Sequence, residues 1–395
     1  MFKTWTIIDD LLSHDIVGHY LWEPKLLVGE LLGRGTTVSI AGHRSINPDQ
    51  FAGALTIPAF ALHHEASVSQ DPEWRHIENF VVHNLDYLKG LNGLDQGIFT
   101  DSLTLMLDVS DQQLLGTIRW FSTFEASKRP KVAIILKGQF DWSERNHGLG
   151  LIRKVWSDSP PFFKEHVRVC SRSQMSADRY AEILGARPHV LPSALGPTAK
   201  EIRLSRERVG PQTGPLVVSF LAGARAERGA TLIPGVVAQC APMGVRFLIQ
   251  AIDAAQRTAG VTSLKALSNH PGVRFHEGAL PREDYNDWIA QSVVLLPYSA
   301  ERYQSRQSGV YLEAKSLGAP VIVPAGTWMA EEVARLGNGL VFDKYSAPSI
   351  AGCIARAQTE LEGLRARAAA CAAEHQREHG ADRCVDAIEA LFADA

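Results

Sequence analysis

The sequence predicts an α/β protein made of two domains, each with a parallel sheet covered by helices. Short β-branched runs alternate along the chain with longer runs in which apolar residues recur at helical spacing, as parallel connections require. The alternation pauses in the polar, proline-containing stretch 192–214, which is typical of a linker, and restarts at Leu216. We therefore expect domains at 1–198 and 199–375, with a last helix (about 376–395) packing back on the first domain.

The composition is that of an ordinary globular protein, with 45% hydrophobic and 21% charged residues among 395. A net charge of −3 gives no polyelectrolyte signature, so nucleic acid is a poor candidate partner. The five cysteines form no C-x-x-C pair, which favours a reducing cytoplasm and argues against a zinc site. Acidic residues precede any long apolar run at the start, and no run approaches roughly 18 apolar residues. We therefore expect neither a signal peptide nor a membrane span.

Each predicted strand of the first half is a short apolar run followed by a loop and an amphipathic helix. The strands are expected at 4–8, 36–41, 103–107, 131–136, 167–170 and 189–191. Gly18 and His19 lie between the first strand and its helix, whose first turn suits Pro24. Loops after parallel strands carry functional groups, so His19 is a candidate base or substrate contact. A structural hydrogen bond at the helix start is the alternative.

The segment 140–164 mixes aromatic residues with arginine and lysine. This mixture suits contact with an acceptor or with the inner face of a membrane. The alternative, which we favour, is a loop that packs its aromatic side chains inward.

The second half repeats the order of strands and helices. Its strands are expected at 216–221, 245–250, 273–276, 293–296 and 321–323. Arg225 and Arg228 follow the first of them, at the expected carboxyl edge of a sheet. They are candidate phosphate ligands, and the alternative is a pair of surface arginines at a helix start.

The stretch 291–324 holds the strongest functional signal. After a strand and a polar loop, a helical run begins at Gly309 and ends at Gly318. Because backbone N–H groups at a helix start bind anions, Ser308 and Gly309 predict a phosphate site. Glu313, about one turn further in, predicts a contact to a sugar hydroxyl.

The run SGVYLEAKSLGAPVIVP in this stretch resembles the donor-site segment of glycosyltransferases with the GT-B fold, especially those similar to glycosyltransferase family 4. The resemblance implies two Rossmann-like domains facing across a cleft. It also implies a nucleotide diphosphate on Ser308 and Gly309 and the nucleotide ribose on Glu313. Glu313 matches the second glutamate of the family's E-x7-E motif, whereas the first is replaced by Ser305.

The same resemblance implies roles for further positions. Arg225 and Arg228 are similar to the family's R-x-x-K-G element, which contacts donor phosphates, with arginine in place of lysine at 228. Gly278 and Leu280 stand in the loop that holds the nucleobase in the family. The loop with Gly18 stands where the family has a Gly-rich loop facing the donor phosphates and the acceptor.

Two arrangements are open for the missing first glutamate. Glu301 lies in the same loop, with Tyr298 beside it, and is a candidate catalytic carboxylate at the donor sugar. In the alternative arrangement, main-chain groups around Ser305 hold that sugar.

The sequence lacks the motifs of several other enzyme classes. No G-x-G-x-x-G follows a strand, and neither a P-loop nor a G-x-S-x-G elbow is present. The sequence also has no Asp-x-Asp pair, so we expect no catalytic metal and no cofactor besides the nucleotide diphosphate sugar as co-substrate.

The sequence thus predicts a cytoplasmic hexosyltransferase of polysaccharide biosynthesis. It would move a sugar from a nucleotide diphosphate sugar to a glycan, lipid-linked or small-molecule acceptor. Retention of stereochemistry is implied by the resemblance alone. The alternatives are a catalytically silent nucleotide-sugar-binding or scaffold protein, which Ser305 favours, and a nucleotide-sugar epimerase of the same fold.

Overall fold

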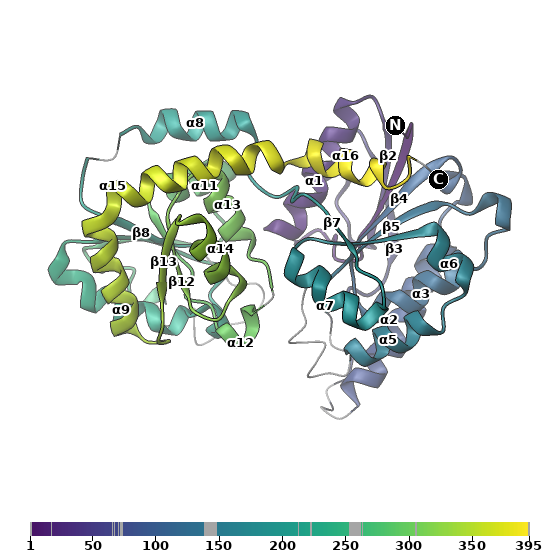
Figure 1. Cartoon of the computed structure of the whole chain (residues 1–395), viewed down its shortest axis with the longest axis horizontal. Helices are drawn as coiled ribbons and strands as arrows, with labels where there is room; N and C mark the ends of the chain where they lie inside the picture. The colour runs from purple at the N-terminus through teal and green to yellow at the C-terminus, as the bar shows by residue number, and fades with distance from the viewer. Residues whose placement is uncertain are drawn as a thin grey trace. The chain divides into compact units, whose positions relative to one another are not determined.

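The computed structural model describes residues 2–393 apart from 17, 65, 67, 70, 72–73, 138–147, 212, 222, 253–261, 263 and 305. The chain divides into two compact units (Figure 1). The N-terminal unit comprises Met1–Leu195 and His379–Ala395, and the C-terminal unit comprises Gly196–Glu378. Each unit contains its own parallel sheet. Within the described ranges, no helix is both long enough and apolar enough to cross a bilayer.

The N-terminal sheet has seven described strands in the order β3-β2-β1-β4-β5-β6-β7. These are β1 (Thr4–Ile8), β2 (Thr37–His43), β3 (Leu55–Phe60), β4 (Ser102–Val109), β5 (Lys131–Leu136), β6 (Val167–Ser171) and β7 (His189–Val190). Strand β3 was not predicted from the sequence, because Pro58 interrupts it. Proline is tolerated there because β3 is an edge strand. The strand order reverses between β1 and β4, whose carboxyl ends therefore form a switch point where ligands bind in such sheets.

Helices cover both faces of this sheet, because strand residues alternate between two apolar clusters. Trp5 and Leu105 belong to one cluster, and Ile8 and Met106 belong to the other. The helices are α1 (His19–Gly33), α2 (Arg75–Asn92), α3 (Asp111–Phe121), α5 (Gly148–Ser157), α6 (Pro161–His166), α7 (Gln174–Leu184) and α16 (Ala381–Ala390).

Two details of this unit bear on the sequence predictions. Helix α1 begins at His19 and not at Pro24, because the carbonyl of Gly18 already accepts hydrogen bonds from the N–H groups of the next turn. In the segment 140–164, Trp156 and Phe163 are buried in the core, as the favoured interpretation expected, but they lie on helices α5 and α6 and not on a loop. Residues 140–147 of that segment lie outside the described ranges.

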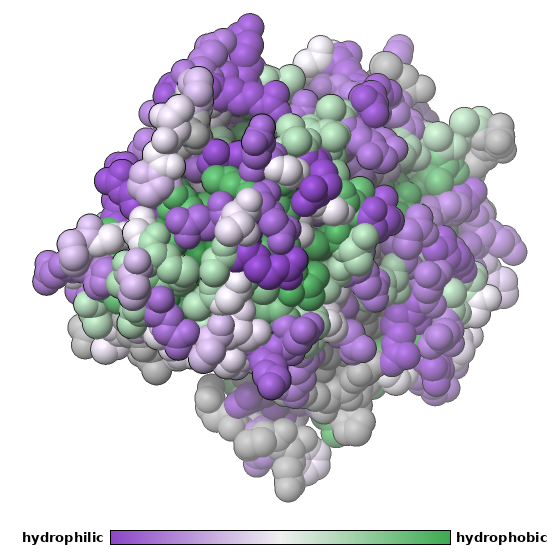
Figure 2. All heavy atoms as spheres, turned by 60° about the vertical axis from the view of Figure 1, so that its left-hand side comes forward, coloured by the Kyte–Doolittle hydropathy of each residue, from purple (hydrophilic) through white to green (hydrophobic). Residues whose placement is uncertain are grey.

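The C-terminal sheet has six described strands in the order β10-β9-β8-β11-β12-β13. These are β8 (Val217–Phe220), β9 (Arg246–Ala251), β10 (Val273–Glu277), β11 (Val293–Leu295), β12 (Val321–Pro324) and β13 (Gly339–Phe342). Its switch point lies between β8 and β11. Hydrophilic side chains dominate the face shown in Figure 2, with apolar residues visible between them.

The helices of this unit are α8 (Ala199–Val209), α9 (Ile233–Cys240), α11 (Arg282–Ala290), α12 (Ala300–Tyr303), α13 (Gly309–Leu317), α14 (Trp328–Leu336) and α15 (Ala347–Glu378). The units meet at Leu195 and Gly196, inside the stretch 192–214 predicted as a linker, but helix α8 occupies much of that stretch. Thr198 and Glu201 form a capping box at its start, and Ile202 is buried on its inner face. The long helix α15 ends shortly before Gly380 (φ 141°), after which α16 begins in the N-terminal unit.

Candidate functional site

Ser308 caps helix α13 at the carboxyl edge of the C-terminal sheet. Its hydroxyl accepts a hydrogen bond from the backbone N–H of Tyr311 at 3.3 Å. Helix α13 ends at Gly318 in the left-handed conformation (φ 75°), as the sequence predicted. The buried side chain of Tyr298 is hydrogen-bonded to Ser308. Ser308, Gly309 and Tyr298 therefore lie together at a helix N-terminus, where free N–H groups and the helix dipole favour an anion.

Glu313 is held in place by two side chains of α11. Its Oε1 accepts a hydrogen bond from Arg282 Nη1 at 3.0 Å, and its Oε2 accepts one from Tyr285 Oη at 2.7 Å. Only 6% of Glu313 is exposed, so it is not a solvated helix residue, and its two partners offset the cost of burying a carboxylate. Burial and the neighbouring Glu313 hold the pKa of Tyr285 well above its usual value, so the phenol stays a donor. An ionised carboxylate has about four acceptor sites, which leaves capacity for ligand hydroxyls.

Gly229 brings the loop after β8 against the end of β11. Its φ is 78°, and a Cβ at this position would lie 2.2 Å from the backbone oxygen of Pro297, so only glycine fits. Arg228, which precedes it, donates a hydrogen bond from Nε to Tyr303 Oη at 3.2 Å. The Arg228 charge also acts on Tyr298. The structure thus brings Arg228 to the same cluster as Ser308.

The other predicted residues of this loop region are more exposed. The Arg225 side chain is 47% exposed, and its Nη1 lies 3.9 Å from Glu227 Oε1. Glu301 is exposed on the four-residue helix α12. Ser305 lies outside the described residues, so both arrangements for the missing glutamate stay open.

The predicted nucleobase loop leads directly into the helix that holds Glu313. Gly278 follows β10 with φ 95°, and its carbonyl accepts a hydrogen bond from Gln250 Nε2 at 3.1 Å. Leu280 is half-buried two residues later. Helix α11 then supplies Arg282, so the loop and Glu313 are joined through one short element.

In the N-terminal unit, Gly18 is the N-cap of α1 with φ 71°. Its carbonyl accepts hydrogen bonds from the N–H groups of Leu21 at 3.1 Å and Trp22 at 3.0 Å. His19 is the first residue of α1, and its side chain lies outside the described part.

A buried Asp–His pair at the carboxyl edge of the N-terminal sheet was not identified from the sequence. Asp10, just after β1, accepts hydrogen bonds from His64 Nδ1 at 2.9 Å and from the His64 backbone N–H at 2.7 Å. Gln113 Nε2 also donates to this carboxylate, at 3.1 Å. These bonds, together with the His64 charge, outweigh burial and lower the pKa of Asp10. No sequence signal links these residues, because 54 positions separate the Asp–His pair.

Further carboxylates line the same edge. Burial and the neighbouring Asp108 raise the pKa of Asp9 well above its usual value. Asp108 has φ 51°, a strained conformation for a non-glycine residue, and pairs with Arg172, which also binds Glu23 at 2.7 Å. Burial raises the pKa of Asp111 to about 6. Perturbed carboxylates and backbone strain of this kind concentrate at functional sites.

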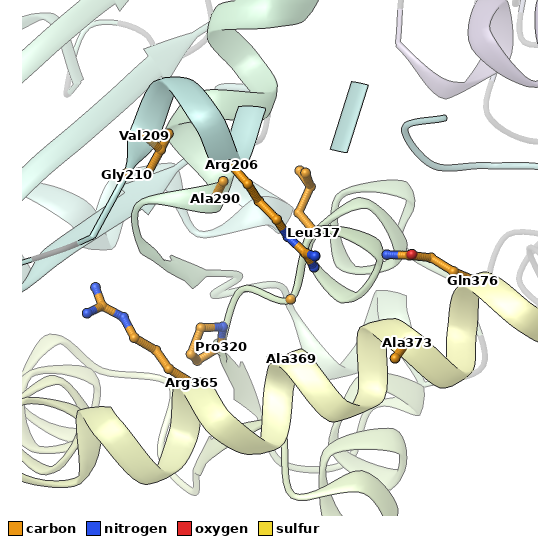
Figure 3. Close-up of a pocket in the computed structure, with 11 residues that line it drawn as sticks. Arg206, Val209, Gly210, Ala290, Leu317, Pro320, Arg365, Ala369, Ala373 and Gln376 are labelled. Carbon is orange, nitrogen blue, oxygen red and sulfur yellow. The ribbon is translucent and has the colours of Figure 1, made fainter. Parts of the chain in front are cut away.

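Two hollows of the C-terminal unit are lined by its described residues. The larger, of about 400 Å³, lies near the amino end of β12 and is shown in Figure 3, where Arg206 and Gln376 point toward each other. The smaller, of about 260 Å³, lies at the carboxyl ends of β12 and β13. Neither hollow is lined by a residue that the sequence predicted to bind a ligand.

No protein-family model and no curated protein matches the chain. Solved structures do. Sucrose-phosphate synthase from Thermosynechococcus elongatus is 14% identical with a TM-score of 0.67, and the match covers all of both chains. Anabaena Alr3699/HepE in complex with UDP and glucose is 12% identical with a TM-score of 0.64, again over all of both chains. WaaG, a glycosyltransferase involved in lipopolysaccharide biosynthesis, is 14% identical over 98% of this chain and all of its own, with a TM-score of 0.61.

At these identities the likeness establishes the fold. The chain has the GT-B fold, with two Rossmann-like α/β units, which confirms the fold class predicted from the sequence.

Proposed function

We propose that this protein is a glycosyltransferase that uses a nucleotide diphosphate sugar as donor. One observation carries the proposal. At the carboxyl edge of the C-terminal sheet, the Arg228 guanidinium, the Ser308-capped start of α13 and the anchored Glu313 lie on elements that meet at one switch point. Solved proteins of the same fold include one described in complex with UDP and with UDP-glucose.

The phosphates would be bound by the N–H groups at the start of α13 and by Arg228, with the exposed Arg225 reaching in from solvent. Positive groups placed there stabilise the charge that develops on a departing diphosphate. We propose that no metal is needed, so turnover is expected to persist in a chelator. The ribose hydroxyls would bind Glu313, whose orientation is set by Arg282 and Tyr285. Gly278 and Leu280 would contact the base.

The acceptor would bind the carboxyl edge of the N-terminal sheet. The polar groups there, Asp10 with His64 and Asp108 with Arg172, suit the recognition of hydroxyl groups. Gly18 and His19 border the same edge. We propose a glycan, lipid-linked or small-molecule acceptor, transfer of a hexose with retention, a role in polysaccharide biosynthesis and a cytoplasmic location.

Contact with a membrane surface is part of the proposal. Helix α2 and its N-cap residue present a line of exposed apolar side chains, which are Trp74, Ile77, Val81 and Leu85. Such a line suits shallow insertion at a lipid interface. Co-sedimentation with vesicles, compared between the wild type and Ile77→Ser, tests this part separately.

The test of the central proposal is acceptor-dependent release of nucleoside diphosphate from a panel of nucleotide sugars. Release that requires acceptor supports transfer. Binding without release favours the catalytically silent alternative, which the serine at 305 motivates. Conversion of the donor without acceptor would identify an epimerase.

A further inference from the structure

The residues that line the smaller hollow of the C-terminal unit have no role in the proposed function, although Ser299 and Ala300 lie between Tyr298 and Glu301. The hollow has a volume of about 260 Å³ and lies where β12 and β13 end and α12 begins. Its lining residues all belong to the described part of one unit. They are Ser299, Ala300, Pro324, Ala325, Phe342, Asp343 and Tyr345. Ligands of parallel α/β sheets bind at this carboxyl edge.

The chemistry of the lining divides into an apolar floor and a polar rim. Phe342 is 2% exposed and Pro324 is buried, so they form the floor. The rim carries the Asp343 carboxylate, which is exposed and makes no hydrogen bond or ion pair with the described residues. The Ser299 side chain adds a hydroxyl to the rim.

Tyr345 is set beside the hollow with much of its ring open. It is 45% exposed, one of the six large hydrophobic side chains that are exposed in the described ranges. Its hydroxyl lies 3.5 Å from the backbone oxygen of Ala226. Burial of the phenol, helped by Glu227, raises the pKa of Tyr345 to about 12, so the hydroxyl remains a donor at neutral pH.

This lining selects against anionic ligands. The free carboxylate of Asp343 repels a phosphate or a carboxylate, and no lysine or arginine lines the hollow. A simple cation would leave the apolar floor and the tyrosine face unused. The larger hollow is the opposite case, since Arg206 and Arg365 line it without any acidic residue (Figure 3).

We propose that the smaller hollow binds one neutral sugar ring. A pyranose has a C–H face that can lie on the floor and on the Tyr345 ring, and an edge of hydroxyls that can donate to Asp343 and Ser299. A few convergent polar groups above an apolar surface are the usual make-up of a small-molecule site. The ring could be the sugar of the donor or a residue of the acceptor. Only this choice of source rests on the proposed function.

Saturation-transfer NMR with methyl glucosides, galactosides and mannosides tests the proposal. Wild type should give ligand signals with at least one glycoside. Asp343→Asn replaces a charge-assisted hydrogen bond with a neutral one, and Tyr345→Ala removes the stacking face. Each should weaken binding roughly tenfold. Lys344→Ala, an exposed neighbour outside the lining, is the matched control and should bind like wild type.

Two further measurements distinguish the possible sources of the sugar ring and separate this proposal from the proposed function. If the donor sugar occupies the hollow, the Asp343 and Tyr345 variants lose affinity for a nucleotide sugar and keep their affinity for the nucleoside diphosphate. If an acceptor residue occupies the hollow, these variants keep the wild-type affinity for both the nucleotide sugar and the nucleoside diphosphate. Only their glycoside binding falls. Absence of any glycoside signal with wild type, or equal signals from all four proteins, would overturn the proposal. Glycoside binding in a protein that binds no nucleotide would leave this site standing while the proposed function fails.

Discussion

Arg282 on α11 and Glu313 on α13 form a partly buried ion pair, with 3.0 Å between Nη1 and Oε1. The pair links the helix after the predicted nucleobase loop to the helix that starts at the predicted phosphate site. A carboxylate anchored in this way keeps one orientation, which lowers the entropy lost when ligand hydroxyls bind to it.

Glu313→Gln should weaken nucleotide binding by roughly fivefold, because a neutral amide accepts weaker hydrogen bonds than a carboxylate. It should also lower thermal stability, since Arg282 loses its closest charge partner, whereas its ion pair with Glu201 at 3.3 Å remains. Glu332→Gln is the control, because it removes an ion pair of α14 with Lys315 outside the proposed donor site. Isothermal titration with nucleoside diphosphates measures both variants. Equal affinity in Glu313→Gln and wild type would remove Glu313 from the donor site.

Arg228→Ala and Arg225→Ala should each reduce donor affinity, because each removes a charge-assisted contact to phosphate. The expected loss is roughly tenfold to a hundredfold. Arg228 should be the more sensitive position, since Tyr303 already holds its guanidinium in place, whereas the Arg225 side chain is 47% exposed. Arg203→Ala on α8, an exposed arginine beside Glu207, serves as the control. Unchanged nucleotide affinity in both test variants would reject the assignment.

Gly229→Ala should disrupt the candidate site through the backbone. The added Cβ would meet the Pro297 carbonyl at 2.2 Å, so the loop carrying Arg228 must move. Gly244→Ala is a matched control, because its φ of 69° is similar and no atom lies within 4 Å of its added Cβ. The control should lose only the roughly 1–2 kcal/mol of left-handed strain. Melting temperature and nucleotide affinity should both fall further in Gly229→Ala, and equal losses in the two variants would contradict the close-approach argument.

Asp111 predicts a pH dependence of stability. Its folded pKa of about 6 lies above the unfolded value of 3.8, so the folded state binds the extra proton. Stability from this group is therefore present below about pH 4 and is lost as pH rises to about 6. The loss is on the order of 3 kcal/mol. Asp111→Asn should flatten the dependence of the melting temperature between pH 4 and 7, whereas the exposed Glu125→Gln should leave it unchanged. A wild-type pH profile in Asp111→Asn would contradict the raised pKa.

Local signals in the sequence predicted the fold well. The Ser308 cap and the Gly318 stop of α13 are fixed by neighbouring residues, and both are confirmed. The start of α1 was misplaced because Pro24 suggested a first turn, while Gly18 already caps the helix. Helix α8 was missed because its composition is polar and it buries only a narrow face, Ile202 and Ser205.

The groups that complete the sites were not predictable, since each depends on contacts distant in sequence. Arg282 is 31 positions from Glu313, and Gln113 is 103 positions from Asp10. Only the folding of the sheets brings such residues to one edge. The resemblance identified the residues of the donor segment. It did not identify the side chains that bind to them, such as Arg282.

The most direct test of the account is a thermal-shift panel of nucleoside diphosphates and nucleotide sugars on the wild type and on Arg228→Ala. We predict that at least one nucleotide stabilises the wild type, by about 2.7 kcal/mol at a hundred times its dissociation constant. At the same ligand concentration, Arg228→Ala should show a clearly smaller shift. A panel in which no nucleotide stabilises the wild type, or in which the variant responds equally, would contradict the assignment of this edge as a nucleotide-sugar site.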